Sequence, residues 1–154
     1  MITSFFKWLV SFLPSFTISK DGDKYLTRYY LFLKDRTFGN IFIHHFHRSD
    51  LDLGAEGKGL LHNHPFDFSF SIILSGGYFE ERRQADNSVL RKIYLPWSLN
   101  FLSKETFHRV DLIDENKGAW SIFFTGSRKN NTWGFWDRIT KKYIPFEKID
   151  GAIK

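Results

Sequence analysis

Two histidines separated by a single residue are the part of the sequence best suited to chemistry. They are His62 and His64, with Asn63 between them. Residues two apart in a β-strand point to the same face of the sheet. The two imidazoles would then lie side by side, close enough to share one metal ion. Pro65 follows and cannot donate to a sheet ladder, so a bulge or the start of a strand is predicted there.

A third histidine, His108, has neighbours that would bring it to the same place. In a strand, its side chain shares a face with Val110 and Leu112. If these two side chains point into an apolar interior, His108 points inward with them and needs a polar partner there. That partner is either a metal ion shared with the first two histidines or an ordinary hydrogen bond.

The remaining histidines, His44, His45 and His47, fall within one predicted strand. Ile41 and Ile43 have the same parity as His45, so His45 is expected to face the interior cavity. The other two are expected on the surface or beside the site, because three further imidazoles would crowd a single metal ion.

Three side chains are candidates for binding an anionic substrate: Tyr78, Arg82 and Arg109. The competing interpretation is that they are parts of solvated strand faces. Arg109 in particular has the parity opposite to His108, which favours the outer face for this arginine.

Eight short runs rich in β-branched and aromatic residues predict the elements that position these groups. Gly76-Gly77 and Asp86-Asn87 look like hairpin turns between such runs. Repeated strands of this spacing indicate a single all-β sandwich or barrel. The runs are Tyr25–Leu33, Ile41–His47, Phe66–Leu74, Tyr78–Gln84, Val89–Leu95, Leu99–Leu102, Phe107–Ile113 and Ala119–Thr125.

The chain begins with an apolar segment that differs from the rest. Residues 1–19 are predicted to form a short helix or arm, broken at Pro14, and residues 20–154 the β-barrel domain. The segment is too short to span a bilayer, and Met1-Ile2-Thr3-Ser4 lacks the basic start of a signal peptide. We expect the helix to pack on the body or on a second subunit of a homodimer, with peripheral membrane contact as the alternative.

Composition limits the classes of function. The 154 residues contain no cysteine, which excludes disulfides, thiolate metal ligands and a cysteine nucleophile. The net charge of +5 is not concentrated in a basic cluster, so no nucleic-acid partner is expected. Phe, Tyr and Trp make up 19% of the chain, which suits packed sheet faces or the walls of an apolar pocket. A reduced, cytoplasmic location fits the lack of cysteine.

The histidine spacing resembles the first motif of the cupins, which are small jelly-roll β-barrels. In this motif a glycine precedes His-x-His, and a glutamate and a second glycine follow. Gly57 or Gly59 precedes the motif here, and Gly76 is the closing glycine. Ser69 stands where the family's glutamate ligand usually lies, which is a departure from the pattern.

The second cupin motif places its histidine at His108, although Ser103 and Glu105 replace the usual proline and glycine. The combination of His-x-His-Pro, Gly-Gly-Tyr and His-Arg-Val is similar to small, uncharacterised bacterial and phage cupins. The resemblance covers about Tyr25 to Trp136 and implies a single-domain cupin jelly roll, or double-stranded β-helix, with a short N-terminal helix. Cupin barrels often pair into homodimers.

The resemblance implies one divalent transition metal per chain, held by His62, His64 and His108. Fe2+ is favoured because three-histidine cupins include thiol-dioxygenase-like iron enzymes; imidazole ligands also suit Zn2+, Ni2+, Cu2+ or Mn2+. Asp67 is a candidate fourth ligand, a partner that fixes a histidine tautomer, or simply a loop residue.

The implied function is a metal-dependent enzyme such as a dioxygenase acting on a small anionic substrate. One alternative is a cupin that binds a metal or small ligand without turnover. A second alternative is a metal-free cupin of the sugar-nucleotide epimerase or isomerase kind, with His62 or His64 as the general base. It would need a basic floor for a diphosphate, for which Arg82, Arg83 and Arg109 are the candidates.

Overall fold

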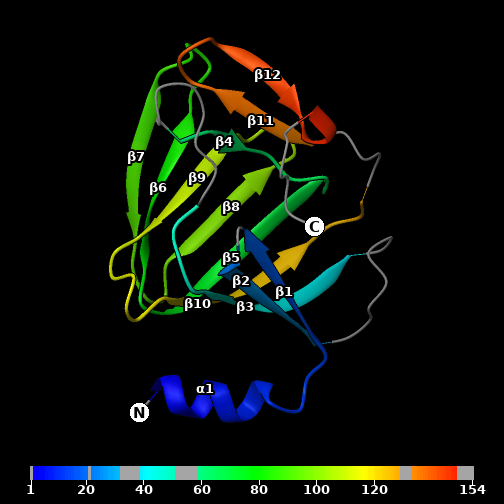
Figure 1. Ribbon diagram of the computed structural model, residues 1–154, viewed down its shortest axis with the longest axis vertical. Helices are drawn as coiled ribbons and strands as arrows, with labels where there is room; N and C mark the ends of the chain where they lie inside the picture. The colour runs from blue at the N-terminus through cyan, green and yellow to red at the C-terminus, as the bar shows by residue number, and fades with distance from the viewer. Residues whose placement is uncertain (1, 21, 32–38, 51–58, 129–132, 149–154) are drawn as a thin grey trace.

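The computed structural model describes residues 2–20, 22–31, 39–50, 59–128 and 133–148, and within them β-strands are the dominant secondary structure. Figure 1 shows the N-terminal helix outside the packed sheets. The elements are α1 (Ile2–Val10), β1 (Ser15–Lys20), β2 (Asp23–Tyr30), β3 (Asn40–Phe46), β4 (Leu61–His62), β5 (Phe68–Ser75), β6 (Tyr78–Arg83), β7 (Val89–Tyr94), β8 (Leu99–Ser103), β9 (His108–Leu112), β10 (Ala119–Thr125), β11 (Gly134–Asp137), β12 (Lys142–Pro145) and the 3-10 helix η2 (Phe146–Lys148).

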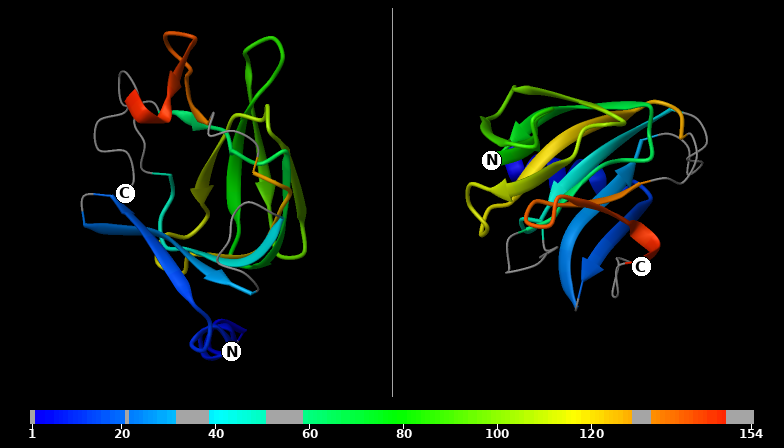
Figure 2. Two further views of the ribbon diagram at one scale, coloured as in Figure 1. Left: turned by 90° about the vertical axis from the view of Figure 1, so that its right-hand side faces the viewer. Right: turned by 90° about the horizontal axis from the view of Figure 1, so that it is seen from above.

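The strands form two six-stranded antiparallel sheets that face each other (Figures 1 and 2). The first sheet has the order β1-β2-β3-β10-β5-β8, and the second has the order β12-β11-β4-β9-β6-β7. All eight predicted strands are present with small differences in their ends, except that residues 32 and 33 of the first one lie outside the described residues. The predicted all-β jelly roll is confirmed. The sheets are separate in their hydrogen bonding, so the predicted barrel is an open sandwich rather than a closed one.

Only one of the two predicted hairpin turns is a hairpin. Asp86-Asn87 joins β6 to β7, which pair directly, and Asn87 adopts the left-handed conformation with φ of 64°. Gly76-Gly77 instead carries the chain from β5 in the first sheet to β6 in the second. A Cβ on Gly76 would lie 2.2 Å from the carbonyl oxygen of Gly118, so the crossing requires glycine.

The predicted N-terminal helix is confirmed, and it packs against the outer side of the first sheet (Figure 2). Phe6, Val10 and Leu13 follow helical spacing and contact a cluster that contains Trp120. The rings of Phe6 and Trp120 stack with centroids 6.0 Å apart. Phe12 lies on the opposite face and is 75% exposed.

Four strands were not predicted individually. β1 pairs with β2 at one edge of the first sheet, so residues 15–19 of the predicted arm are part of that sheet. β11 and β12 form a hairpin near the C-terminal end of the described chain. β4 has only two residues, Leu61 and His62, and lies between β11 and β9. Among the described residues, no helix has the length and apolarity needed to cross a bilayer.

Candidate metal centre

The short strand β4 brings two of the three predicted metal ligands together. In its pairing with β9, His62 lies directly opposite His108. Residues opposite each other in an antiparallel ladder project to the same face of the sheet. Both imidazoles therefore point into the space between the sheets, with ring centroids 4.6 Å apart.

Asn63, the residue between the two motif histidines, anchors the segment that carries His64. Asn63 is buried, and its side-chain oxygen accepts a hydrogen bond from the backbone N–H of Gly134 at 2.8 Å. Its side-chain nitrogen donates to the carbonyl oxygen of Lys104 at 3.2 Å. These contacts hold the chain where it leaves β4. His64 was expected within a strand; it follows the strand instead, yet still turns toward the other two histidines.

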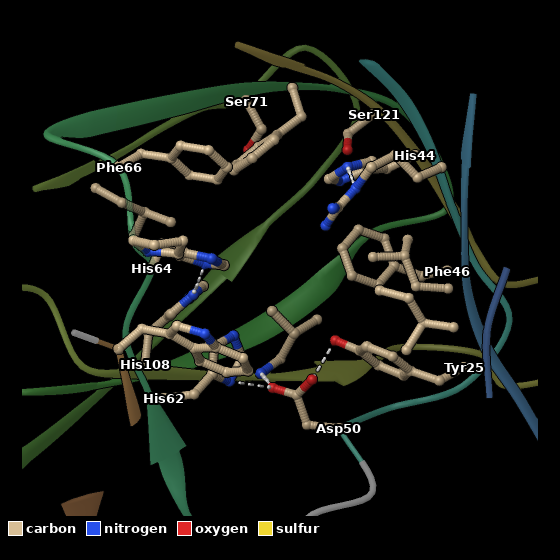
Figure 3. Close-up of a pocket in the computed structure, with 18 of the residues that line it drawn as sticks. Tyr25, His44, Phe46, Asp50, His62, His64, Phe66, Ser71, His108 and Ser121 are labelled. Carbon is tan, nitrogen blue, oxygen red and sulfur yellow. Dashed lines mark hydrogen bonds and ion pairs between the residues drawn. The ribbon is translucent and has the colours of Figure 1, made fainter. Parts of the chain in front are cut away.

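The three imidazoles converge as one cluster (Figure 3). One possible ligand atom from each of His62, His64 and His108 lies within 4.8 Å of the others. The Nε2 atoms of His64 and His108 are 2.9 Å apart and share a hydrogen bond. Two nitrogens at about 2.1 Å from one ion are separated by about 3 Å. Neutral imidazoles at this separation suit a divalent transition metal.

A buried carboxylate supports His108 from the side away from the cluster. Oε1 of Glu80 lies 2.7 Å from Nδ1 of His108. An Nδ1–H that donates to this oxygen leaves the Nε2 lone pair facing the other histidines, as a metal ligand requires. Burial raises the pKa of Glu80, but hydrogen bonds and charges from His108, Asn100 and Arg82 outweigh it and lower that pKa to about 2. Glu80 is therefore a stable anion.

A second carboxylate, Asp50, stands in the same relation to His62. Its Oδ2 atom lies 3.5 Å from Nδ1 of His62 and accepts a hydrogen bond from the backbone N–H of Val110 at 2.7 Å. Its Oδ1 accepts a hydrogen bond from the hydroxyl of Tyr25 (Figure 3). These contacts orient the His62 ring so that its Nδ1 faces Asp50.

His64 is held in its neutral form. Burial, and the charges of His108, His62, Arg28 and His44, keep the pKa of His64 well below its usual value. A metal binds the neutral imidazole and competes with protons for it. His64 is thus ready to bind a metal at neutral pH without first losing a proton.

The cluster opens into a cavity of about 380 Å³ between the two sheets. Most of its lining is apolar, and three of its described lining residues carry a formal charge: Arg28, Asp50 and Arg128. His44 and Ser121 lie across the cavity from the three histidines (Figure 3). The apolar lining includes Phe16, Ile18, Leu26, Phe46, Phe66, Leu102, Val110, Phe123, Trp133, Phe135 and Phe146.

The other predicted site residues divide between the cavity and its surroundings. Tyr78 lines the cavity, and burial raises the pKa of its hydroxyl to about 12, so the hydroxyl stays protonated. Ser69 is buried in β5 between its strand partners and is not among the lining residues. Asp67 is also outside the lining, and the possible metal ligands of the described residues are the three histidines without it.

The prediction that His45 faces the cavity is wrong. Its ring stacks on Trp120 with centroids 4.0 Å apart, on the side of the sheet that α1 covers. His44 faces the cavity instead. Ile43, whose parity supported the prediction, also packs under α1. Both faces of β3 are covered, so apolar parity alone cannot tell which face is inside.

The three arginines that were candidates for binding a diphosphate make contacts outside the cavity lining. Arg82 donates to Glu80 at 2.7 Å and to Asn100 at 2.8 Å. Arg83 lies over the ring of Trp136, 3.9 Å from its centroid. Arg109 donates to Asp111 at 3.1 Å. None of these three arginines lines the cavity, so they do not form the basic floor that was predicted for the metal-free alternative.

Sequence reasoning missed Glu80, Asp50, Arg28 and Arg128. Glu80 had a usable signal, because it shares strand parity with Tyr78, which was itself a candidate. Asp50 lies in a turn, and no spacing rule connects it to His62. The two arginines come from opposite ends of the chain, and only the fold brings them to one cavity.

Comparisons with known proteins identify the fold of the chain. No family model matches the sequence, and no curated protein matches it. Among solved structures, similar folds include Fe(II)-HppE with an alternative substrate (TM-score 0.55, 12% identity), covering 75% of this chain and 57% of that one. Streptomyces albus HEPD with 2-hydroxyethylphosphonate and Fe(II) has a TM-score of 0.55 at 10% identity, covering 73% and 25%.

Oxalate decarboxylase from Bacillus subtilis is a further similar structure, with a TM-score of 0.54 and 10% identity, covering 80% of this chain and 30% of that one. The chain spans little more than half the length of the first of these proteins and less of the others. At these identities the likeness establishes the fold, which is the jelly roll of the cupins.

Proposed function

We propose that the protein is a mononuclear metal enzyme, with His62, His64 and His108 as the metal ligands and iron(II) as the favoured ion. The observation that supports this most strongly is the convergence of three imidazoles, two of which are backed by the buried carboxylates Glu80 and Asp50. A hydrogen-bonded core histidine does not need two further histidines within ligand distance of it.

The protein's own residues would do three things around such an ion. The carboxylates fix the ring orientation of His62 and His108 and raise their basicity as ligands. The apolar walls of the cavity keep bulk water away from the reacting groups. Three neutral ligands leave the full charge of the ion uncompensated, which favours an anionic substrate.

We infer a dioxygenase-type oxidation of a small anionic organic molecule, for which iron(II) would supply the redox chemistry with dioxygen. Two similar structures contain iron(II) by their printed names, and both share the fold. That likeness supports the choice of iron.

The deciding experiment is elemental analysis of protein purified without a histidine tag. We expect about one transition metal per chain in the wild type, and loss of that metal in both His62→Ala and His108→Ala. His45→Ala is the matched control, because His45 lies outside the cavity. Metal retained in His108→Ala would remove that residue from the ligand set.

Turnover needs a separate measurement. Protein loaded with iron(II) should consume oxygen with at least one member of a panel of thiols and carboxylates. A protein that binds metal and consumes no oxygen with any of them would instead support the metal-binding module without turnover.

A further inference from the structure

The described residues that line the cavity include more cationic than anionic side chains. Among its described lining residues, Arg28 and Arg128 are cationic, and Asp50 is the single acidic residue. The Asp50 carboxylate already interacts with Tyr25, His62 and the Val110 backbone, so it is committed to the metal ligands. The cavity therefore has an excess of cationic groups that an anionic ligand would balance.

Of the two arginines, Arg128 gives the stronger indication of a ligand-binding site. Its Nε atom is buried and has no hydrogen-bond partner among the described residues. A buried donor without a partner is costly, and in native proteins it commonly marks a site where a ligand or water completes the bonding. The backbone of Arg128 forms a bridge with Phe66, two residues after His64, so this arginine lies beside the metal-binding segment.

Arg28 reaches the cavity from the first sheet. Its Nε donates to Nε2 of His44 at 3.1 Å, and its guanidinium lies over the ring of Phe42, 5.2 Å from the centroid. Burial and the charge of Arg28 keep the pKa of His44 well below its usual value, so His44 stays neutral and adds no charge of its own. The two contacts hold the arginine in place within an otherwise apolar wall.

We propose that the cavity binds an organic carboxylate, whose acid group pairs with Arg128 and Arg28 and whose apolar body lies against the aromatic walls. Arginine presents a planar pair of donors that matches a carboxylate. The apolar lining residues provide a surface against which the apolar body of such an acid can pack. This substrate class rests on the proposed function, because the acid occupies the cavity that contains the metal ligands.

The test compares two probes that share a carbon skeleton. One is 3-phenylpropionate, and the other is the neutral 3-phenylpropan-1-ol. Binding of each is measured by calorimetry, once with metal-free protein and once with zinc-loaded protein. The wild type should bind the acid at least about tenfold more tightly than the alcohol in both forms, because the charged hydrogen bonds are made to arginine.

Substitutions then test whether the two arginines bind the carboxylate of the probe. Arg128→Gln and Arg28→Gln should each weaken binding of the acid by about tenfold or more, and change binding of the alcohol by less than about twofold. Arg128→Lys and Arg28→Lys keep the charge and should retain more of the affinity. Arg48→Gln is the control, since Arg48 is an exposed arginine paired with Asp23 at 3.3 Å.

The outcomes separate this proposal from the metal site. If the wild type binds the acid equally well after Arg128→Gln and Arg28→Gln, or binds it only through zinc, or does not bind it at all, the carboxylate proposal is wrong. A second outcome would separate the two sites. If the wild type does not bind zinc, the proposed metal site is wrong. If the metal-free wild type still binds the acid and the two glutamine variants bind it more weakly, the arginine site is supported all the same.

Discussion

Nδ1 of His108 lies 2.7 Å from Oε1 of Glu80, and both side chains are buried. Glu80 in turn accepts hydrogen bonds from Asn100 at 2.9 Å and from Arg82 at 2.7 Å. The resemblance to the cupins placed Ser69 at the position of that family's usual glutamate ligand. In this structure a buried carboxylate, Glu80, lies behind His108 and orients its imidazole.

This relationship predicts the effect of removing the charge of Glu80. Glu80→Gln keeps the size of the side chain, but it no longer favours an Nδ1–H on His108. We expect zinc affinity to fall by about 10- to 100-fold, as for other groups that orient metal ligands. Competition with a fluorescent chelator measures it. Glu81→Gln on the same strand, which removes an ion pair with Arg138, is the control. Equal zinc affinity in Glu80→Gln and wild type would contradict the role.

Asn63 gives a second prediction, this time for the segment that carries His64. Asn63→Ala would leave the N–H of Gly134 buried without its side-chain partner. We expect the free energy of unfolding of the metal-free protein to fall by about 2 kcal/mol, and zinc affinity to fall because His64 loses its anchor. Urea unfolding and zinc titration test the two effects. The exposed Asn116→Ala should change neither; a stable Asn63→Ala variant with normal zinc binding would contradict the prediction.

The sequence predicted the eight main strands because their apolar residues and turn signals repeat regularly. It predicted the three histidines because strand parity and a known motif both pointed to them, although the motif itself ends outside the strand. The sequence did not predict correctly which face of a strand points into the cavity when other elements cover both faces. His45 has apolar neighbours of the same parity, and the helix α1 makes that outer face apolar too. Asp50 could not be assigned, because its partners Tyr25 and His62 are distant in the chain.

Protonation of His45 predicts how stability depends on pH. Burial, and the charges of His47 and Lys7, lower its pKa to about 4 from the ordinary 6.5. Between these values the unfolded chain binds a proton that the folded chain does not, so stability falls as the pH is lowered from about 6.5 towards 4. His45 is partly open to solvent, and its share of the slope will be a fraction of the roughly 1.4 kcal/mol per pH unit of one full proton.

The measurement is urea unfolding of metal-free protein at a series of pH values, with His45→Gln beside the wild type. The variant cannot take up this proton, so its stability should fall less steeply across the window. Lys142→Gln, at an exposed residue of β12, is the control and should follow the wild-type slope. Identical slopes for His45→Gln and wild type would show that the stacked ring on Trp120 is not the source of the pH dependence.

The outer face of α1 predicts self-association. Phe5, Trp8 and Phe12 are 57%, 61% and 75% exposed, and their rings form a continuous ridge with centroid separations of 6.2 Å and 5.7 Å. Exposed aromatic ridges of this kind usually mark an interaction surface. We expect a homodimer, with a mass twice the 18.3 kDa of one chain, by light scattering of the full chain.

The double substitution Trp8→Glu with Phe12→Glu should convert the dimer to a monomer, because it places charge on the ridge and leaves the buried face of α1 untouched. Leu90→Glu, at a residue of β7 that is 56% exposed, tests whether any exposed apolar residue would have the same effect. A dimer that survives the double substitution would place the interface elsewhere. A wild-type monomer that binds phospholipid vesicles, and loses that binding in the double variant, would assign the ridge to membrane contact instead.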